Sequence, residues 1–166
     1  MLQPVVRRTW GPQGDTPLQY RWERHDRLSG MSVVTASPKR GHLDLYYVLQ
    51  EHNIHAAEIE TFVAELLNHF PHGIILVLDR WPVHFPAVDQ LRHRFRRRLR
   101  IEWLPSYAPE LNADEQVWNR TKYTDLANFC PENLTELAHA VRQSLEQTKT
   151  NQSLLRSFFE YAELKL

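Results

Sequence analysis

The stretch IILVLDRWPVH, residues 74–84, decides how the fold of this 166-residue chain is interpreted. It opens with five apolar residues in succession, a pattern typical of a β-strand that is buried on both faces. The run ends at Asp79, so a carboxylate stands at the carboxyl end of the strand, where open α/β sheets bind their ligands. The sequence therefore predicts a strand over residues 74–78 that positions a functional acid.

A second acid stands in the segment LPSYAPELNADEQVW, residues 104–118. Asn112 is a favourable N-cap, and Glu115 follows at the capping-box position three residues later. We expect a helix to begin after Asn112, with Glu115 in its first turn. One carboxylate at a strand end and one at a helix start can converge on a hard cation such as Mg²⁺. The plainer interpretation is that Glu115 only caps its helix and Asp79 only forms a turn.

The segment between these two acids is strongly basic. LRHRFRRRLR, residues 91–100, contains six arginines and no acid. Leu91, Phe95 and Leu99 recur at four-residue intervals and predict a helix whose opposite face carries the arginines. Arginine favours bidentate contacts with phosphate, so we interpret the segment as a nucleic-acid-binding surface; a solvated helix face is the alternative. With Lys122 on the next helix, the predicted nucleic-acid contacts are Arg92, Arg94, Arg96, Arg97, Arg98 and Arg100.

The remaining hydrophobic pattern predicts strands and helices in alternation. Residues 1–30 are rich in turn residues and predict an irregular arm. MSVVTAS and HLDLYYVLQ, on either side of PKRG, predict an antiparallel hairpin. The order of elements indicates a single α/β domain, residues 1–166, with a mixed sheet flanked by helices. The other expected elements are helices over residues 56–70, 134–145 and 154–162 and a short strand over residues 101–104.

The composition is that of an ordinary soluble domain, with 42% hydrophobic residues, 24% charged residues and a formal net charge of zero. The charge is unevenly spread, because residues 41–79 contain acids without Lys or Arg whereas residues 80–100 are strongly basic. We recognise neither a signal peptide nor a long apolar span, so no membrane partner is expected. Cys130 is the single cysteine and cannot form an intrachain disulfide, which favours a reducing, cytoplasmic location.

The two acidic segments resemble motifs of DDE transposases from the mariner-like branch of bacterial insertion sequences. IILVLDRWPVH resembles that family's second acidic motif, in which an apolar strand ends in Asp and a His follows five residues later. LPSYAPELNADEQVW resembles the third motif, whose acid follows a Leu-Asn pair. WGPQGDTP, residues 10–17, is similar to a segment that follows the family's first acidic motif. The resemblance spans about residues 7–160 and implies an RNase H-like catalytic domain.

By this resemblance Asp79 corresponds to the second catalytic acid and Glu115 to the third, and both are implied ligands of Mg²⁺ (or Mn²⁺). His84 and Asn112 are implied to contact the metal ligands without binding the metal themselves; the alternative for His84 is a structural, hydrogen-bonded histidine. The implied reaction is metal-dependent DNA cleavage and strand transfer during transposition. Its implied partners are element ends, target DNA and a second copy of the chain, and its implied location is the bacterial nucleoid. Arg80 departs from the family's usual Asn and puts metal binding in question.

A larger departure concerns the family's first acid, which lies on a central strand upstream of the segment that matches residues 1–14. We therefore expect an N-terminally truncated fragment whose catalysis is impaired, unless an upstream reading frame supplies the acid. Asp15 and Asp26 lie in turn-rich sequence and Asp44 alternates with leucines on a strand, so none is a good substitute. The alternative function is a noncatalytic nucleic-acid-binding or assembly module derived from a transposase.

Overall fold

The computed structural model describes residues 6–8, 11–14 and 27–164. Part of the WGPQGDTP motif, together with Asp15 and Asp26, lies outside the described residues. The described pieces of the predicted arm up to Leu28 contain a turn but neither a helix nor a strand. Within the described part of the chain, no helix is both long enough and apolar enough to cross a membrane.

The chain divides into two compact units. Unit 1 combines Met1–His52 with Ala113–Leu166, and unit 2 is Asn53–Asn112. The described strands form two two-stranded sheets, one antiparallel and one parallel. Strands in both orientations therefore alternate with helices along the chain, which confirms the predicted α/β class.

Unit 1 is built on an antiparallel hairpin of β1 (Ser29–Ala36) and β2 (Leu43–Gln50). Gly41 closes the turn with a φ of 59°, a conformation that glycine adopts without steric cost. The hairpin predicted on either side of PKRG is confirmed, although β1 begins at Ser29 instead of Met31.

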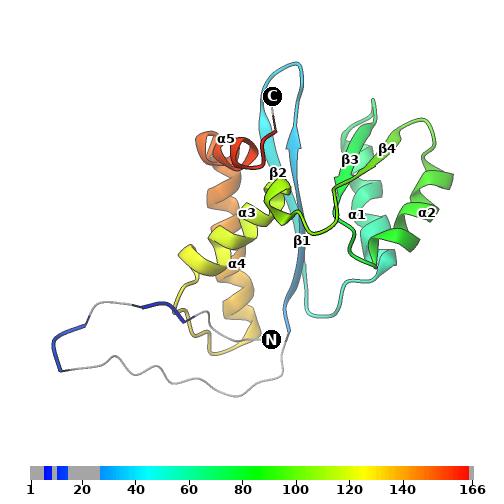
Figure 1. The fold of residues 1–166 in the computed structure, drawn as a ribbon. Coiled ribbons are helices and arrows are strands. Elements are labelled where there is room, and N and C mark those ends of the chain that lie inside the picture. The colour runs from blue at the N-terminus through cyan, green and yellow to red at the C-terminus, as the bar shows by residue number, and fades with distance from the viewer. Residues whose placement is uncertain (1–5, 9–10, 15–26, 165–166) are drawn as a thin grey trace. The chain divides into compact units, whose positions relative to one another are not determined.

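Among the described residues, unit 1 also contains three helices and a π-helical turn (Figure 1). The predicted helix after Asn112 is confirmed, but its last part is a π-helical turn, and the two predicted C-terminal helices are also confirmed. Asn133 and Asn151 are the N-caps of the last two helices, because each side-chain oxygen accepts a backbone N–H three residues on. The elements are α3 (Ala113–Arg120), the π-helical turn (Thr121–Asp125), α4 (Leu134–Thr150) and α5 (Gln152–Tyr161).

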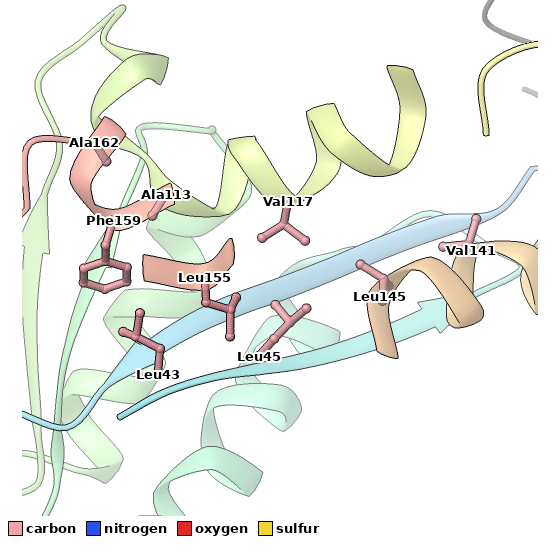
Figure 2. Close-up of a cluster of buried hydrophobic side chains, with 9 residues drawn as sticks. All are labelled: Leu43, Leu45, Ala113, Val117, Val141, Leu145, Leu155, Phe159 and Ala162. Carbon is pink, nitrogen blue, oxygen red and sulfur yellow. The ribbon is translucent and has the colours of Figure 1, made fainter. Parts of the chain in front are cut away.

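The hydrophobic core of unit 1 joins β2 to these three helices (Figure 2). Leu43 and Leu45 are two residues apart on β2, so they point to the same face of the sheet, and both are fully buried. Burial of each large apolar side chain contributes about 1.5–3 kcal/mol, so this shared face is the main stabilising feature of unit 1. The helices contribute Ala113, Val117, Val141, Leu145, Leu155, Phe159 and Ala162.

Unit 2 is a β-α-β arrangement preceded by a helix. The predicted strand over residues 74–78 and the predicted helix over residues 56–70 are confirmed, but the expected burial of the strand on both faces is wrong, because Ile75 and Val77 are 64% and 52% exposed. The two strands are parallel, with Leu78 of the first opposite Trp103 of the second. Leu76 and Ile101 lie next to each other in this ladder and are buried. The elements are α1 (Ala56–His69), β3 (Ile74–Leu78), α2 (His84–Arg94), β4 (Leu99–Trp103) and a 3₁₀ turn (Pro109–Leu111).

The prediction of one helix through Leu91, Phe95 and Leu99 is wrong. Helix α2 ends at Arg94, Phe95 is its C-cap, and Leu99 already belongs to β4. The Phe95 carbonyl accepts hydrogen bonds from the N–H groups of Arg98 (2.9 Å) and Leu99 (3.0 Å), which close a turn. Leu99 is buried because it pairs with the first residue of β3. The four-residue spacing therefore predicts correctly that Leu91 and Leu99 are buried, but it does not predict that Leu99 lies in a strand.

Replacing Gly73 with alanine should destabilise unit 2. Gly73 has a φ of +93°, and an added Cβ would lie 2.5 Å from the Arg98 carbonyl oxygen, a backbone atom that cannot swing away. We expect the free energy of unfolding, measured by chemical denaturation, to fall by about 2–4 kcal/mol. Gly41→Ala is the control: its φ is +59°, but the nearest atom is 3.9 Å away. Only a conformational cost of about 1 kcal/mol is expected there, so equal losses would contradict the close-approach argument.

The contact between Tyr47 of β2 and Glu146 of α4 should make unit 1 sensitive to alkaline pH. Tyr47 Oη donates to Glu146 Oε1 at 2.6 Å, and burial together with this hydrogen bond raises the pKa of Tyr47 from 10.0 to about 12. Because the pKa is higher in the folded state, the stabilisation is fully present below pH 10 and is lost as the pH rises to about 12.

Urea unfolding across this pH range measures the effect. The free energy of unfolding should fall more steeply for the wild-type chain than for Tyr47→Phe, which retains the ring but cannot ionise. Parallel pH profiles for the two proteins would show that another group causes the alkaline sensitivity.

Candidate functional site

Asp79 lies directly after β3, as the sequence predicted, and its carboxylate oxygen Oδ1 is held by two contacts. Asp79 Oδ1 accepts the N–H of Trp81 at 3.0 Å and lies 2.9 Å from His84 Nδ1. The Asp79 side chain is 46% exposed, whereas that of His84 is 16% exposed. Both contacts engage Oδ1, so the half-exposed carboxylate can offer Oδ2 to a ligand.

His84 is the first residue of α2, and three contacts fix its position. Its backbone N–H donates to the Trp81 carbonyl at 2.9 Å, and its ring packs edge-on against the Trp81 ring with 5.4 Å between centroids. Its Nδ1 also lies 3.2 Å from the Asp79 carbonyl oxygen. The structure therefore brings His84 to Asp79 within unit 2. The Asp79–Trp81 hydrogen bond also closes a turn, so this geometry is compatible with both roles predicted for Asp79, the turn residue and the catalytic acid.

Arg80, the departure from the usual Asn, turns toward the opposite strand. Its Nε donates to the Leu104 carbonyl at 3.1 Å, and the Leu104 N–H donates to the Leu78 carbonyl at 2.8 Å. These bonds prolong the β3–β4 contact by one residue beyond the ladder. Arg80 thus binds backbone at the sheet edge and is engaged there instead of with the Asp79 carboxylate.

Glu115 lies in the first turn of α3, half-buried, in unit 1. Asn112 directly precedes α3, at the position predicted for the N-cap, and its N–H donates to the Pro109 carbonyl at 3.0 Å. The neighbouring residue Asp114 accepts the hydroxyl of Ser32 at 2.6 and 2.8 Å, one distance to each carboxylate oxygen. This bond joins the start of α3 to β1 and fixes the turn that carries Glu115.

Ser32 and Asp114 are polar partners that the sequence analysis missed. They stand 82 positions apart, so no local pattern connects them. An acid in the first turn of a helix is common, because it interacts favourably with the helix dipole, and Asp114 therefore gave no separate signal.

The two predicted catalytic acids belong to different units, Asp79 to unit 2 and Glu115 to unit 1. Each carboxylate is therefore described in its own surroundings. Among the described residues, no group of three or more His, Cys, Asp and Glu side chains is placed to hold a metal ion. Two oxygen-donor carboxylates remain the candidate ligand set, and their chemistry fits a hard divalent cation.

The six arginines of residues 91–100 have different surroundings. Arg98 is half-buried, and its Nη2 donates to the carbonyls of Leu67 and Phe70 at the end of α1. Arg100 pairs with Glu102 through a 2.7 Å contact between Nε and Oε1. Arg100 is also exposed, and the other four are exposed at the end of α2 and in the following turn. We call them the arginine cluster: Arg92, Arg94, Arg96 and Arg97.

Lys122, the last predicted nucleic-acid contact, is exposed in the π-helical turn of unit 1. The predicted cationic residues are thus divided between the two units, with the arginine cluster in unit 2.

The chain is similar to solved structures of the Mos1 transposase. A Mos1 mariner paired-end complex with Mn aligns with a TM-score of 0.65 and 14% identity, covering 97% of this chain and 49% of that one. The Mos1 strand transfer complex gives 0.58 and 13%, covering 97% and 48%. The paired-end complex with the left transposon end gives 0.59 and 13%, covering 96% and 48%. The chain spans about half the length of these proteins, and the likeness confirms the predicted RNase H-like fold.

No curated protein is a match for the chain. The family described as DDE superfamily endonuclease matches residues 1–137, which is more than half of the sequence. The sequence resemblance at Asp79 and Glu115 and this family match agree, and the chain belongs to the DDE superfamily endonucleases.

Proposed function

We propose that this chain is a transposase catalytic domain in which Asp79 and Glu115 together hold Mg²⁺ or Mn²⁺ and act on DNA. The observation that carries the proposal is the strand-end carboxylate of Asp79, held through Oδ1 by Trp81 and His84, in a DDE superfamily endonuclease. Mos1, whose fold this chain shares, was solved as a mariner paired-end complex with Mn. Unit 1 and unit 2 form one catalytic domain by this proposal.

The chain's own residues would orient the ligands and the substrate. His84 and the Trp81 N–H fix Asp79 Oδ1, which limits rotation of the carboxylate. The Ser32–Asp114 hydrogen bond fixes the helix turn that carries Glu115. When bound, the divalent cation would activate a water or a DNA 3′-hydroxyl and stabilise the leaving oxygen.

DNA is the proposed partner, and the exposed arginine cluster is its proposed contact in unit 2. The Mos1 structures in the comparison are a paired-end complex with a transposon end and a strand transfer complex, which supports an analogous role here. We extend the proposal to a homodimer assembled on DNA in the bacterial cytoplasm, at the nucleoid.

A second candidate function is a noncatalytic nucleic-acid-binding or assembly module. The exposed arginine cluster favours it, because phosphate binding by arginine needs no metal ion. The turn contact between Asp79 and Trp81 also gives the acid a structural role that is independent of catalysis.

Mn²⁺ binding tests the metal-ligand proposal without relying on activity. Isothermal titration of the wild-type chain should detect a Mn²⁺ site, and Asp79→Asn or Glu115→Gln should each weaken its affinity at least tenfold, because a carboxylate ligand is lost. Asp89→Asn is the control, since Asp89 is an exposed acid on α2. Affinity that is the same in all four proteins would exclude Asp79 and Glu115 as a shared metal site and favour the noncatalytic module.

DNA binding tests the arginine cluster. In fluorescence anisotropy with duplex DNA, Arg96→Gln with Arg97→Gln should weaken binding about tenfold at low salt. The slope of log affinity against log salt should fall by about 2, because each lost phosphate contact removes about 0.9.

The control for that experiment is Lys39→Gln with Arg40→Gln, which removes two exposed cations from the hairpin turn. This protein should bind within about twofold of the wild-type affinity if the cluster is specific. A loss as large as that of the cluster variant would indicate that net charge, and not the cluster, determines binding.

A further inference from the structure

A groove of about 450 Å³ lies within unit 1, against α3 and the π-helical turn. We call it the Tyr123 groove. Its lining offers two guanidinium groups, two side-chain amides and aromatic rings, and none of its lining residues is acidic. Its volume is within the range of roughly 300–1,000 Å³ that is usual for ligand sites. The lining residues are Arg7, Gln116, Asn119, Arg120, Tyr123, Thr124 and Phe158.

One face of the helical segment forms most of the groove. Gln116, Asn119, Arg120 and Tyr123 follow the spacing i, i+3, i+4 and i+7, which places them along one side of a helix. Glu115 directly precedes this series on α3. A ligand lying along the groove would therefore pass close to the turn that carries the proposed catalytic acid.

Arg7 reaches the groove from the N-terminal part of the chain and is held there by two contacts. Its backbone N–H donates to Asn128 Oδ1 at 2.7 Å, and its guanidinium carbon lies 5.3 Å from the centroid of the Tyr123 ring. A guanidinium that stacks on an aromatic ring keeps its N–H donors in its own plane, available to a phosphate. Tyr123 itself is 42% exposed, so part of its ring surface remains open.

A polar network fixes the other cation and the π-helical turn. Arg120 Nε lies 3.3 Å from Asp125 Oδ2, which accepts the Ser144 hydroxyl at 2.7 Å. The Ser144 Oγ is also 2.9 Å from Thr121 Oγ1, and both of these residues are buried. The network ties the π-helical turn to α4 and so holds Arg120 and Tyr123 at the same groove. Single π-helical turns of this kind are frequent at functional sites.

We propose that the Tyr123 groove binds one strand of nucleic acid, with a phosphodiester on Arg7 and a base against Tyr123. A guanidinium group recognises phosphate through bidentate hydrogen bonds, and exposed aromatic rings stack on bases with little sequence preference. The amides of Gln116 and Asn119 can donate to and accept from base edges. The inference rests on the proposed function in taking DNA as the polymer, and it adds a contact in unit 1 to the arginine cluster of unit 2.

Anisotropy titrations of the full chain with a fluorescein-labelled single-stranded oligonucleotide test the groove. Arg7→Gln and Tyr123→Ala should each weaken binding about tenfold. Arg7→Gln should also lower the salt slope by about 0.7, whereas Tyr123→Ala should leave the slope unchanged because stacking releases no counterion. The matched controls are Arg142→Gln, at an exposed arginine of α4, and Tyr161→Ala, at a tyrosine of α5 that is 63% exposed. Both controls should bind within twofold of the wild-type chain.

Photo-cross-linking gives a second readout that needs no substitution. An oligonucleotide with 5-iodouracil should form an adduct that mass spectrometry maps to Tyr123. If the groove variants bind as tightly as their controls and the adducts map elsewhere, the proposal that the Tyr123 groove binds nucleic acid is wrong. If the Arg96 and Arg97 double variant is weakened in that case, the proposed function survives. A wild-type chain that binds no DNA would overturn both proposals.

Discussion

The parallel ladder between β3 and β4 is the constraint on which unit 2 depends. Its register places Leu99 at the start of β4, which obliges α2 to end at Arg94. At the other end, the chain leaves the ladder after Leu78, so Asp79 projects from the carboxyl edge of the sheet. The crossover to β4 then begins with α2, whose first residue His84 contacts Asp79. One pairing register therefore determines both where the acid stands and which side chain holds it.

In unit 1, hydrogen bonds between polar side chains fix the orientation of helix α3 on the apolar core. The core residues of β2, α3, α4 and α5 explain why these elements associate, but apolar contacts alone tolerate small rotations of a helix. The Ser32–Asp114 bond fixes the start of α3, and the Thr121–Ser144 pair fixes the turn after its end. Each such bond contributes about 1 kcal/mol, and a partner left buried without one costs about 1–3 kcal/mol. A rotated α3 would lose both bonds, so the side chains that it presents, including Glu115, are held in one orientation.

The elements that could be predicted from sequence are those whose burial has a local signature. The run before Asp79, the hairpin around PKRG and the helices after Asn133 and Asn151 all carry such patterns, and the structure contains each of them. The end of α2 could not be predicted, because Leu99 is buried by pairing with a strand that lies 25 positions earlier. The π-helical turn depends in the same way on Thr121 meeting Ser144, 23 positions away. For the proposed site, the motif predicted Asp79, His84 and Glu115, and the structure places His84 against Asp79; the sequence gave no indication of Asp114 with Ser32.

The arginines show that a count of charges does not reveal which of them contact other parts of the protein. Arginine combines a long apolar stem with five N–H donors, so it can link backbone carbonyls as readily as it binds phosphate. Arg98 uses this capacity at the end of α1, Arg80 uses it at the sheet edge, and Arg100 is paired with Glu102. Arg80 and Arg100 are exposed although they make these contacts, so density along the sequence cannot show which exposed arginines already bind a carbonyl or carboxylate of the protein. Arg7, which lies outside the arginine-rich segment and is followed by Arg8, illustrates the converse, since Tyr123 and Asn128 position it at the Tyr123 groove.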